Sequence, residues 1–112
     1  MHARTKALRF DRKTVEKIYK RDGGCIFCRI GYEMPDSPQM YIFDVMHIVN
    51  RSQGGLGIEQ NGVIGCRWHH NMMDNGNRGK RAEMLDYIRR YMKQIYPDWD
   101  EQKLYYKKGM QT

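Results

Sequence analysis

Four side chains able to ligate a metal ion occur as two pairs with the same spacing. Two residues separate Cys25 from Cys28, and two residues separate Cys66 from His69. This gap lets both side chains of a turn point at one ion, and two such pairs complete the tetrahedral Cys₃His set of structural zinc sites. Because thiolate and imidazole ligands select zinc over magnesium, the sequence predicts a structural Zn²⁺ site.

Two other roles for the cysteines stay open at this point. A redox-active Cys-x-x-Cys pair is typical of a thioredoxin-like βαβ context, which the surrounding pattern lacks, and thiols can also be buried and inert. The chain has three cysteines, and its first residues do not resemble a secretory signal peptide. An odd count without an export signal argues against a disulfide framework and indicates a reducing compartment.

A second group of reactive residues lies between and beside the two zinc pairs. In chain order it consists of Asp44, His47, Arg51, Asn61 and His70. Hydrolysis of a phosphodiester needs a nucleophilic water, charge relief on the phosphoryl oxygens and help for the leaving oxygen. A neutral histidine can accept the proton of the water, and a divalent ion can polarise the phosphoryl group. These residue types therefore suit metal-assisted phosphodiester hydrolysis.

The segment from about Arg21 to Gly76 closely resembles the HNH nuclease family in the order and spacing of these residues. Its Cys-x-x-His-His and Asp-Asn-Gly sequences also look phage- or prophage-like. The resemblance implies a treble-clef-like finger of two strands and one helix, the ββα-metal fold, stapled by zinc. It also implies that His47 is the general base, that Asn61 orients the loop or the base, and that His70 holds a catalytic divalent ion.

The adjacent histidines His69 and His70 need separate assignments, and the spacing from Cys66 selects His69 for zinc. Neighbouring side chains on a helix point about 100° apart, so His70 can face a cleft instead. Asp74 stands four residues after His70 and shares its helix face. The two could grip one divalent ion, or Asp74 could cap the helix. A carboxylate is unfavourable at a helix C-terminus, which favours the metal role.

One position departs from the family pattern. The residue before the base is usually a metal-ligating Asp or His, but here it is Met46, whose thioether suits a hard ion poorly. Asp44 shares a face of the expected strand with Met46 and could substitute, although two residues span about 6 to 7 Å. The alternative is an altered metal preference, because histidine ligation favours Mn²⁺, Ni²⁺ or Co²⁺ over Mg²⁺.

The chain is basic, with a formal net charge of +7. That charge suits a polyanion such as nucleic acid, although it could also serve solubility alone. Arg4, Lys6 and Arg9 are candidates for contacts with a DNA backbone. Arg51 follows the base strand and could clamp a phosphate through two hydrogen bonds, or it could be a solvated loop residue.

Turn residues and hydrophobic patterns predict the elements that position these groups. Asp11 can cap a helix that ends at the glycine pair 23–24. Aromatic and β-branched residues favour a strand over 41–48 and a shorter one over 62–65. Residues 67–74 are typical of one or two helical turns, which would carry His69, His70 and Asp74.

The C-terminal third has a helical pattern. Apolar residues recur at steps of three and four over 84–95, which predicts an amphipathic helix ended by Pro97. Asp98 with Glu101 resembles a capping box for a last short helix. No run approaches the 20 or so apolar residues that cross a bilayer, so we expect no membrane span.

We therefore expect one small α+β domain over residues 1–112. A basic arm and helix would occupy 1–21, the zinc-stapled finger 22–76, and a helical extension 77–112. The expected function is metal-dependent endonucleolytic cleavage of DNA, including nicking, with Mg²⁺, Mn²⁺ or Ni²⁺ as the catalytic ion. The alternative is a non-catalytic, zinc-stabilised module that binds nucleic acid.

The expected partners, oligomeric state and cellular location follow from this function. DNA would be the main partner, and a protein partner could supply site selection, because so short a chain has little room for a separate base-reading domain. The chain would act as a monomer or a homodimer in the cytoplasm of a bacterial or phage-infected cell.

Overall fold

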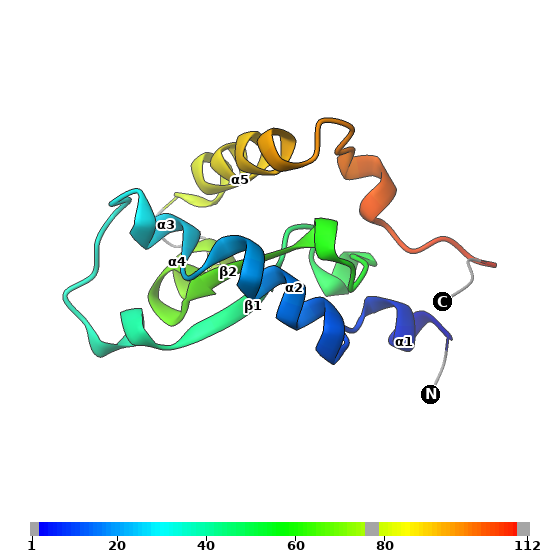
Figure 1. Cartoon of the computed structure of the whole chain (residues 1–112), viewed down its shortest axis with the longest axis horizontal. Coiled ribbons are helices and arrows are strands. Elements are labelled where there is room, and N and C mark those ends of the chain that lie inside the picture. The colour runs from blue at the N-terminus through cyan, green and yellow to red at the C-terminus, as the bar shows by residue number, and fades with distance from the viewer. Residues whose placement is uncertain (1–2, 76–78, 110–112) are drawn as a thin grey trace.

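The computed structural model describes residues 3–75 and 79–109, which form a small α+β fold (Figure 1). Residues 1, 76, 77 and 112, where predicted segments begin or end, lie outside the described residues. The elements in chain order are α1 (Ala3–Leu8), α2 (Arg12–Asp22), α3 (Ile26–Arg29), the 3-10 helix η1 (Pro38–Tyr41), β1 (Phe43–His47), η2 (Arg51–Gln53), η3 (Glu59–Asn61), β2 (Gly62–Cys66), α4 (Arg67–Asn75), α5 (Arg81–Ile95) and η4 (Glu101–Leu104).

The two strands pair as an antiparallel hairpin. Phe43 lies opposite Cys66 at one end, and His47 lies opposite Gly62 at the other. The first strand is shorter than the predicted 41–48, because Tyr41 belongs to the preceding 3-10 helix η1. The second strand matches its predicted start and is one residue longer.

The two faces of the hairpin meet different helices. A Cβ atom at Gly62 would collide with Ile18 of α2 and with Phe10, so the face that carries Gly62 and His47 packs on the N-terminal residues. Side chains alternate along a strand. Asp44 therefore points the other way, toward α4, to which it is hydrogen-bonded. The hairpin thus lies between α2 and α4.

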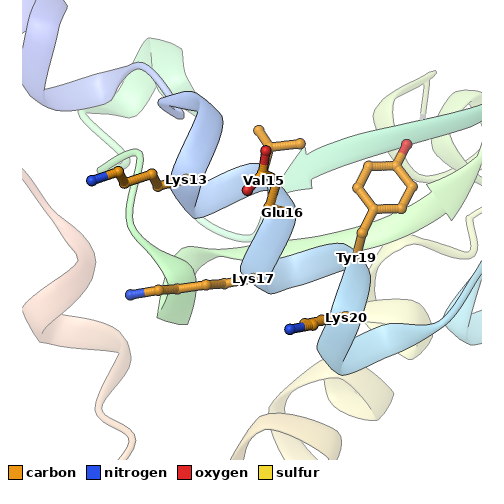
Figure 2. A pocket seen from close by; sticks show the side chains of 6 residues that line it. All are labelled: Lys13, Val15, Glu16, Lys17, Tyr19 and Lys20. Carbon is orange, nitrogen blue, oxygen red and sulfur yellow. The ribbon is translucent and has the colours of Figure 1, made fainter.

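Both predicted ends of α2 are confirmed. The Asp11 carboxylate accepts a hydrogen bond from the Thr14 amide at 2.8 Å. Gly23 ends the helix with a φ of 71°, and its amide donates to the Tyr19 carbonyl at 2.9 Å. The helix buries Ile18 against the hairpin and presents a lysine-rich face on its outer side (Figure 2).

The predicted C-terminal helix is confirmed, and the short helix after it begins at a different residue from the predicted one. Met84, Ile88 and Met92 of α5 are fully buried, as the apolar stripe predicted, whereas Ile95 at its end is 37% exposed. The predicted cap at Asp98 is wrong, because Asp100 accepts the hydrogen bond from the backbone at the start of η4, at 2.9 Å. No helix among the described residues is long and apolar enough to cross a membrane.

A buried carboxylate joins α2 to the hairpin and to α5. Asp22 is 1% exposed and accepts two hydrogen bonds from the Arg21 guanidinium, at 2.7 and 3.0 Å. It also accepts one from the Ile64 amide of β2 at 2.9 Å and one from the Tyr91 hydroxyl of α5. Since every oxygen of this buried ion is bonded, the charge is stabilised in the core, and the three elements are fixed around it.

We predict that Asp22→Ala lowers the free energy of unfolding by about 3–5 kcal/mol, because the buried Arg21 guanidinium would lose its counter-ion. Asp98→Ala, at an exposed carboxylate, is the control and should change stability by no more than about 0.5 kcal/mol. Chemical denaturation of both variants measures the difference. Equal stabilities would show that the Asp22 network does not hold the elements together.

Candidate metal centre and histidine site

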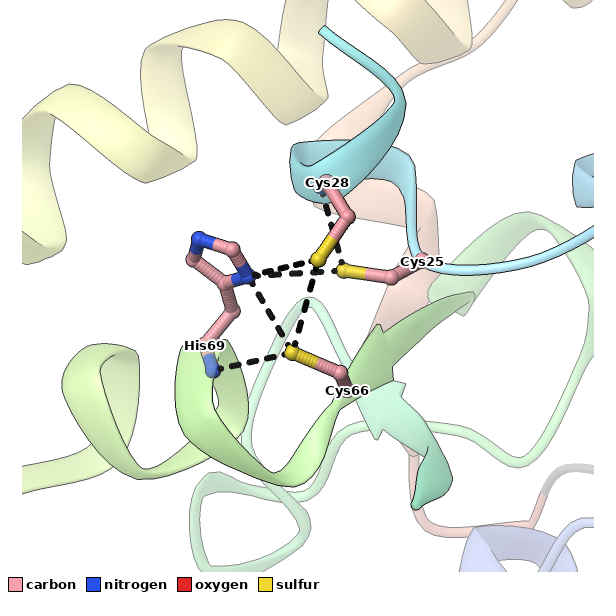
Figure 3. A group of neighbouring side chains, drawn as sticks. All are labelled: Cys25, Cys28, Cys66 and His69. Atoms are coloured by element: carbon pink, nitrogen blue, oxygen red, sulfur yellow. Dashed lines mark hydrogen bonds between the residues drawn. The ribbon is translucent and has the colours of Figure 1, made fainter. Parts of the chain in front are cut away.

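The two predicted ligand pairs converge on one point. The ligand atoms of Cys25, Cys28, Cys66 and His69 all lie within 4.8 Å of one another (Figure 3). The sulfurs of Cys28 and Cys66 are 3.7 Å apart, and His69 Nδ1 lies 3.2 to 3.6 Å from the three sulfurs. Two sulfurs bound tetrahedrally at 2.3 Å from one Zn²⁺ would be about 3.8 Å apart. The cluster is therefore compatible with a structural metal such as zinc.

Each ligand pair is formed by the first turn of a helix. Cys25 caps α3, where its sulfur accepts the Cys28 amide at 3.4 Å, and Cys66 precedes α4, where its sulfur accepts the His69 amide at 3.5 Å. Burial alone would raise the pKa of the Cys25 thiol, but hydrogen bonds from His69 and from backbone amides lower it to about 6. Such donors stabilise the Cys25 thiolate, whereas burial raises the pKa of the Cys28 and Cys66 thiols.

The imidazole of His69 is oriented by the chain itself. Its Nε2 lies 2.6 Å from the Tyr32 carbonyl oxygen, and a carbonyl can only accept, so Nε2 carries the proton. Nδ1 then faces the three sulfurs, where it donates to the Cys25 thiolate when it is protonated and can offer its lone pair to a metal when it is not. A histidine held through its other ring nitrogen is the usual arrangement in metal sites.

The predicted base, His47, is held on the opposite side of the hairpin from α4. Its Nε2 lies 2.8 Å from the Leu8 carbonyl oxygen, and the Phe10 ring packs on it with centroids 4.3 Å apart. Nε2 must donate to that carbonyl, so Nδ1 is unprotonated in the neutral ring. Burial lowers the pKa of His47, and the nearby positive charge of Arg51 lowers it further.

Asn61 fixes the loop that follows His47. It is fully buried, and its side-chain oxygen accepts the Val49 amide at 2.8 Å. Its side-chain nitrogen donates to the carbonyls of Val49 and Leu56, at 3.2 and 2.8 Å. One amide side chain thus satisfies three backbone groups across the loop and holds its two ends together.

Both ends of the described chain also hold this loop. The Gly57 amide donates to Ala7 of α1 at 2.9 Å, and the Leu56 amide donates to Leu104 of η4 at 2.8 Å. A Cβ atom at Gly57 would lie 2.2 Å from the backbone of Arg9. Gly57 is therefore required by the close approach of backbone from the N-terminal residues, whereas a Cβ atom at Gly55 would lie 1.7 Å from the Val49 carbonyl oxygen of the same loop.

His70 lies between two carboxylates on the α4 side of the hairpin. Its Nδ1 is 2.9 Å from Asp44, and its Nε2 is 2.9 Å from Asp74. Arg67 binds both oxygens of Asp44, at 2.8 and 2.9 Å, and thereby lowers the pKa of that carboxyl group, with a smaller contribution from His70. A neutral imidazole has one N–H, so contact with both carboxylates requires either a second proton or a cation.

This arrangement fits a divalent ion only in part. Two ligands at right angles, each about 2.1 Å from an ion, are about 3.0 Å apart, which matches His70 Nε2 and Asp74. Asp44 lies on the other ring nitrogen, where it orients His70 and cannot share that ion. Among the described residues, the cysteine cluster is the only group of three or more metal-ligating side chains within reach of one another.

His47 and His70 are not brought together. Asp44, which contacts His70, is three residues before His47, about 10 Å along the strand, and points to the other face. Arg51 lies in η2 just after the base strand, and Arg4, Lys6 and Arg9 lie in or next to α1.

The sequence did not reveal the groups that orient the two histidines. The Leu8 carbonyl and the Phe10 ring hold His47, and Arg67 holds Asp44. A backbone carbonyl carries no sequence signal. Arg67 stands three residues before His70, a helical spacing that could have suggested a shared face.

Comparison with known proteins supplies no relative: no family model, no curated protein and no solved structure matches the chain. The assignment of the two histidine sites therefore depends on their own geometry.

The adjacent histidines give a matched test of the metal centre. We predict that the purified chain contains about one equivalent of zinc, that His69→Ala reduces zinc content to below roughly a tenth of that value, and that His70→Ala leaves it unchanged. Elemental analysis gives the zinc content, and thermal unfolding should show a loss of stability for His69→Ala. Zinc loss in His70→Ala, or zinc retention in His69→Ala, would contradict the ligand set.

Proposed function

We propose that the chain is an endonuclease of the HNH type, with a zinc-stapled finger, which hydrolyses DNA phosphodiester bonds with His47 as general base. One observation carries the proposal. The His47 ring has one nitrogen fixed on the Leu8 carbonyl and the other, Nδ1, without a hydrogen-bond partner among the described residues. An imidazole that is oriented, neutral and open at one nitrogen is what proton abstraction from water requires.

The electrostatics of His47 support this role. Its lowered pKa keeps the ring neutral near pH 7, so Nδ1 can accept the proton of a water molecule as the oxygen of that water attacks phosphorus. The proton that Nε2 donates to Leu8 stays in place and fixes the tautomer. Asn61 supports the role from a distance, because it holds the backbone immediately after the base.

Cationic side chains near His47 support a phosphodiester as the substrate. The charge of Arg51 acts on His47, and its guanidinium can donate two parallel hydrogen bonds to phosphate oxygens. Arg4, Lys6 and Arg9 lie in or next to α1, the helix that supplies the Leu8 carbonyl. The backbone of a bound DNA would therefore meet positive charge on the side of the hairpin that carries the base.

His70 and Asp74 are the described pair that would hold a divalent ion, but an ion there would lie on the other face of the hairpin from His47 and could not polarise the phosphoryl group that His47 acts on. Asp44 and Arg67 would keep the His70 ring in place. This pair stands apart from His47, so the two contributions can be tested separately.

A second function is favoured by the residue before the base. Met46 is 1% exposed, and its sulfur would touch a Cβ atom placed at Gly65, so this position offers a buried thioether where a hard ion needs an oxygen or nitrogen ligand. A zinc-stabilised module that binds nucleic acid without cutting it would accommodate this feature. The absence of nicked or linear plasmid with Mg²⁺, Mn²⁺ and Ni²⁺ in turn would favour that module.

We predict that His47→Ala lowers the rate of plasmid cleavage by about 10²- to 10⁴-fold, the usual contribution of a general base. Conversion of supercoiled plasmid to nicked and linear forms gives the rate for wild type, for His47→Ala and for His70→Ala. Zinc content and DNA binding of the His47 variant, which should match those of the wild type, are the controls for folding. Cleavage at the wild-type rate by a folded His47→Ala chain would refute the assignment.

The pH dependence of cleavage tests the same residue independently. A base must be unprotonated to act, and the pKa of His47 is lowered, so cleavage should be lost only below the ordinary histidine value of about 6.5. Arg51→Ala removes a positive charge that disfavours the protonated ring, so the midpoint of the acidic limb should rise. The rate profile between about pH 4.5 and 8 gives both midpoints. An acidic limb with its midpoint above pH 7, or a midpoint that Arg51→Ala lowers, would exclude His47 as the titrating group.

A further inference from the structure

Phe10, just before α2, and Tyr19 of α2 contact the two ends of β1, while the helix itself packs mainly on β2. Next to the start of α2, the Phe10 ring packs on His47, the last residue of β1. Toward the end of α2, the Tyr19 hydroxyl lies 3.5 Å from the carbonyl oxygen of Phe43, the first residue of β1. The outer face of α2 and the start of β1 therefore form one continuous surface that leads to the proposed base.

A row of lysines follows this surface. Lys13, Lys17 and Lys20 recur at steps of four and three residues, so they share one helix face and span about 10 Å along the axis. In Figure 2 the three lysines project to one side of α2 and Tyr19 projects to another, and all four line one open hollow with Val15.

The lysine charges of the row are not held in ion pairs, although the Asp11 carboxylate lies close enough for Lys13 and Lys17 to lower its pKa. None of the three lysines forms an ion pair with a described carboxylate. The acidic residue of the hollow, Glu16, is instead paired with Arg12 at 3.3 Å. A row of unpaired lysines on a rigid helix attracts a chain of regularly spaced negative charges.

Two exposed aromatic rings lie near the lysine row. Tyr19, which is 39% exposed, lines the same hollow as the lysines, and Phe43, whose carbonyl oxygen the Tyr19 hydroxyl contacts, is 44% exposed. Both are large apolar groups turned to solvent, whereas Trp99 is 5% exposed. Stacking on aromatic side chains beside a cationic track is the general mode of single-strand binding.

We infer that this surface binds a single-stranded segment of nucleic acid, with phosphates on Lys13, Lys17 and Lys20 and bases stacked on Tyr19 and Phe43, and that it delivers the strand to His47. The inference rests on the proposed function and names its substrate class. Stacking requires unpaired bases, which favours a single strand over a duplex. An acidic polypeptide would satisfy the lysines but would leave the rings without stacking partners.

The test measures binding in the His47→Ala background, so that cleavage does not enter the result. The probes are a fluorescein-labelled oligonucleotide of about 20 nucleotides and the duplex of the same sequence, followed by anisotropy across a salt series. The first variant replaces Lys13, Lys17 and Lys20 with Ala. Its control replaces Arg90, Lys93 and Lys103, which are exposed cations of α5 and η4, so both variants lose the same charge.

We expect the α2 variant to bind the single strand at least about 10-fold more weakly. The slope of log K against log salt concentration should fall in magnitude by about two, because three phosphate contacts are lost. The control should stay within about twofold of the parent. Tyr19→Ala with Phe43→Ala should weaken single-strand binding by roughly 10-fold or more and leave duplex binding nearly unchanged.

Three results would overturn the inference: equal losses in the α2 variant and its control, tighter binding to the duplex, or equally effective competition by poly-glutamate, which carries charge without bases. The plasmid assay keeps this outcome separate from the proposed function. If cleavage depended on His47 but not on the lysine row, the proposed binding surface would be wrong and the nuclease proposal would stand. If the α2 variant weakened single-strand binding but the chain cut no substrate, the nuclease proposal would be wrong and the binding surface would stand.

Discussion

The architecture depends on one geometric constraint, the convergence of four ligand atoms from α3 and from the junction of β2 with α4. Cys66 ends the strand and His69 stands in the first turn of the helix, so their common centre fixes the angle between strand and helix. His70 follows directly and is turned about 100° away, which carries its ring to Asp44. The cysteine cluster therefore also determines where the second histidine points.

The position of His47 has a different physical origin. Its ring is held by a backbone carbonyl and an aromatic ring from the residues before α2, and its loop is held by Asn61 and by backbone contacts from α1 and η4. Segments from both ends of the described chain thus hold the loop that follows this imidazole, and only the N-terminal one contacts the ring itself. The residues before α2 are part of the candidate site, because they fix the tautomer of His47 and help to bury its ring, and burial is the main cause of its lowered pKa.

The two groups of candidate residues lie on opposite faces of the hairpin. On the α2 side lie His47, Arg51 and the cationic surface; on the α4 side, the imidazole of His70 connects Asp44 to Asp74. The buried Asp22 network fixes the α2 side to β2 and α5, so the two faces are held in a defined relation.

The sequence by itself determined the features that depend on local spacing. The two Cys-x-x pairs, the caps of α2 at Asp11 and Gly23, the hairpin strands and the buried stripe of α5 all follow from residue type and short-range geometry. Only the tertiary structure decided the partners that come from distant segments: the Leu8 carbonyl on His47, Arg67 on Asp44, and the separation of His47 from His70 on opposite faces. Every residue has a backbone carbonyl, so the sequence does not mark the one that contacts His47. The alternation of side chains along a strand says which residues share a face, but only the packed helices decide what each face contacts.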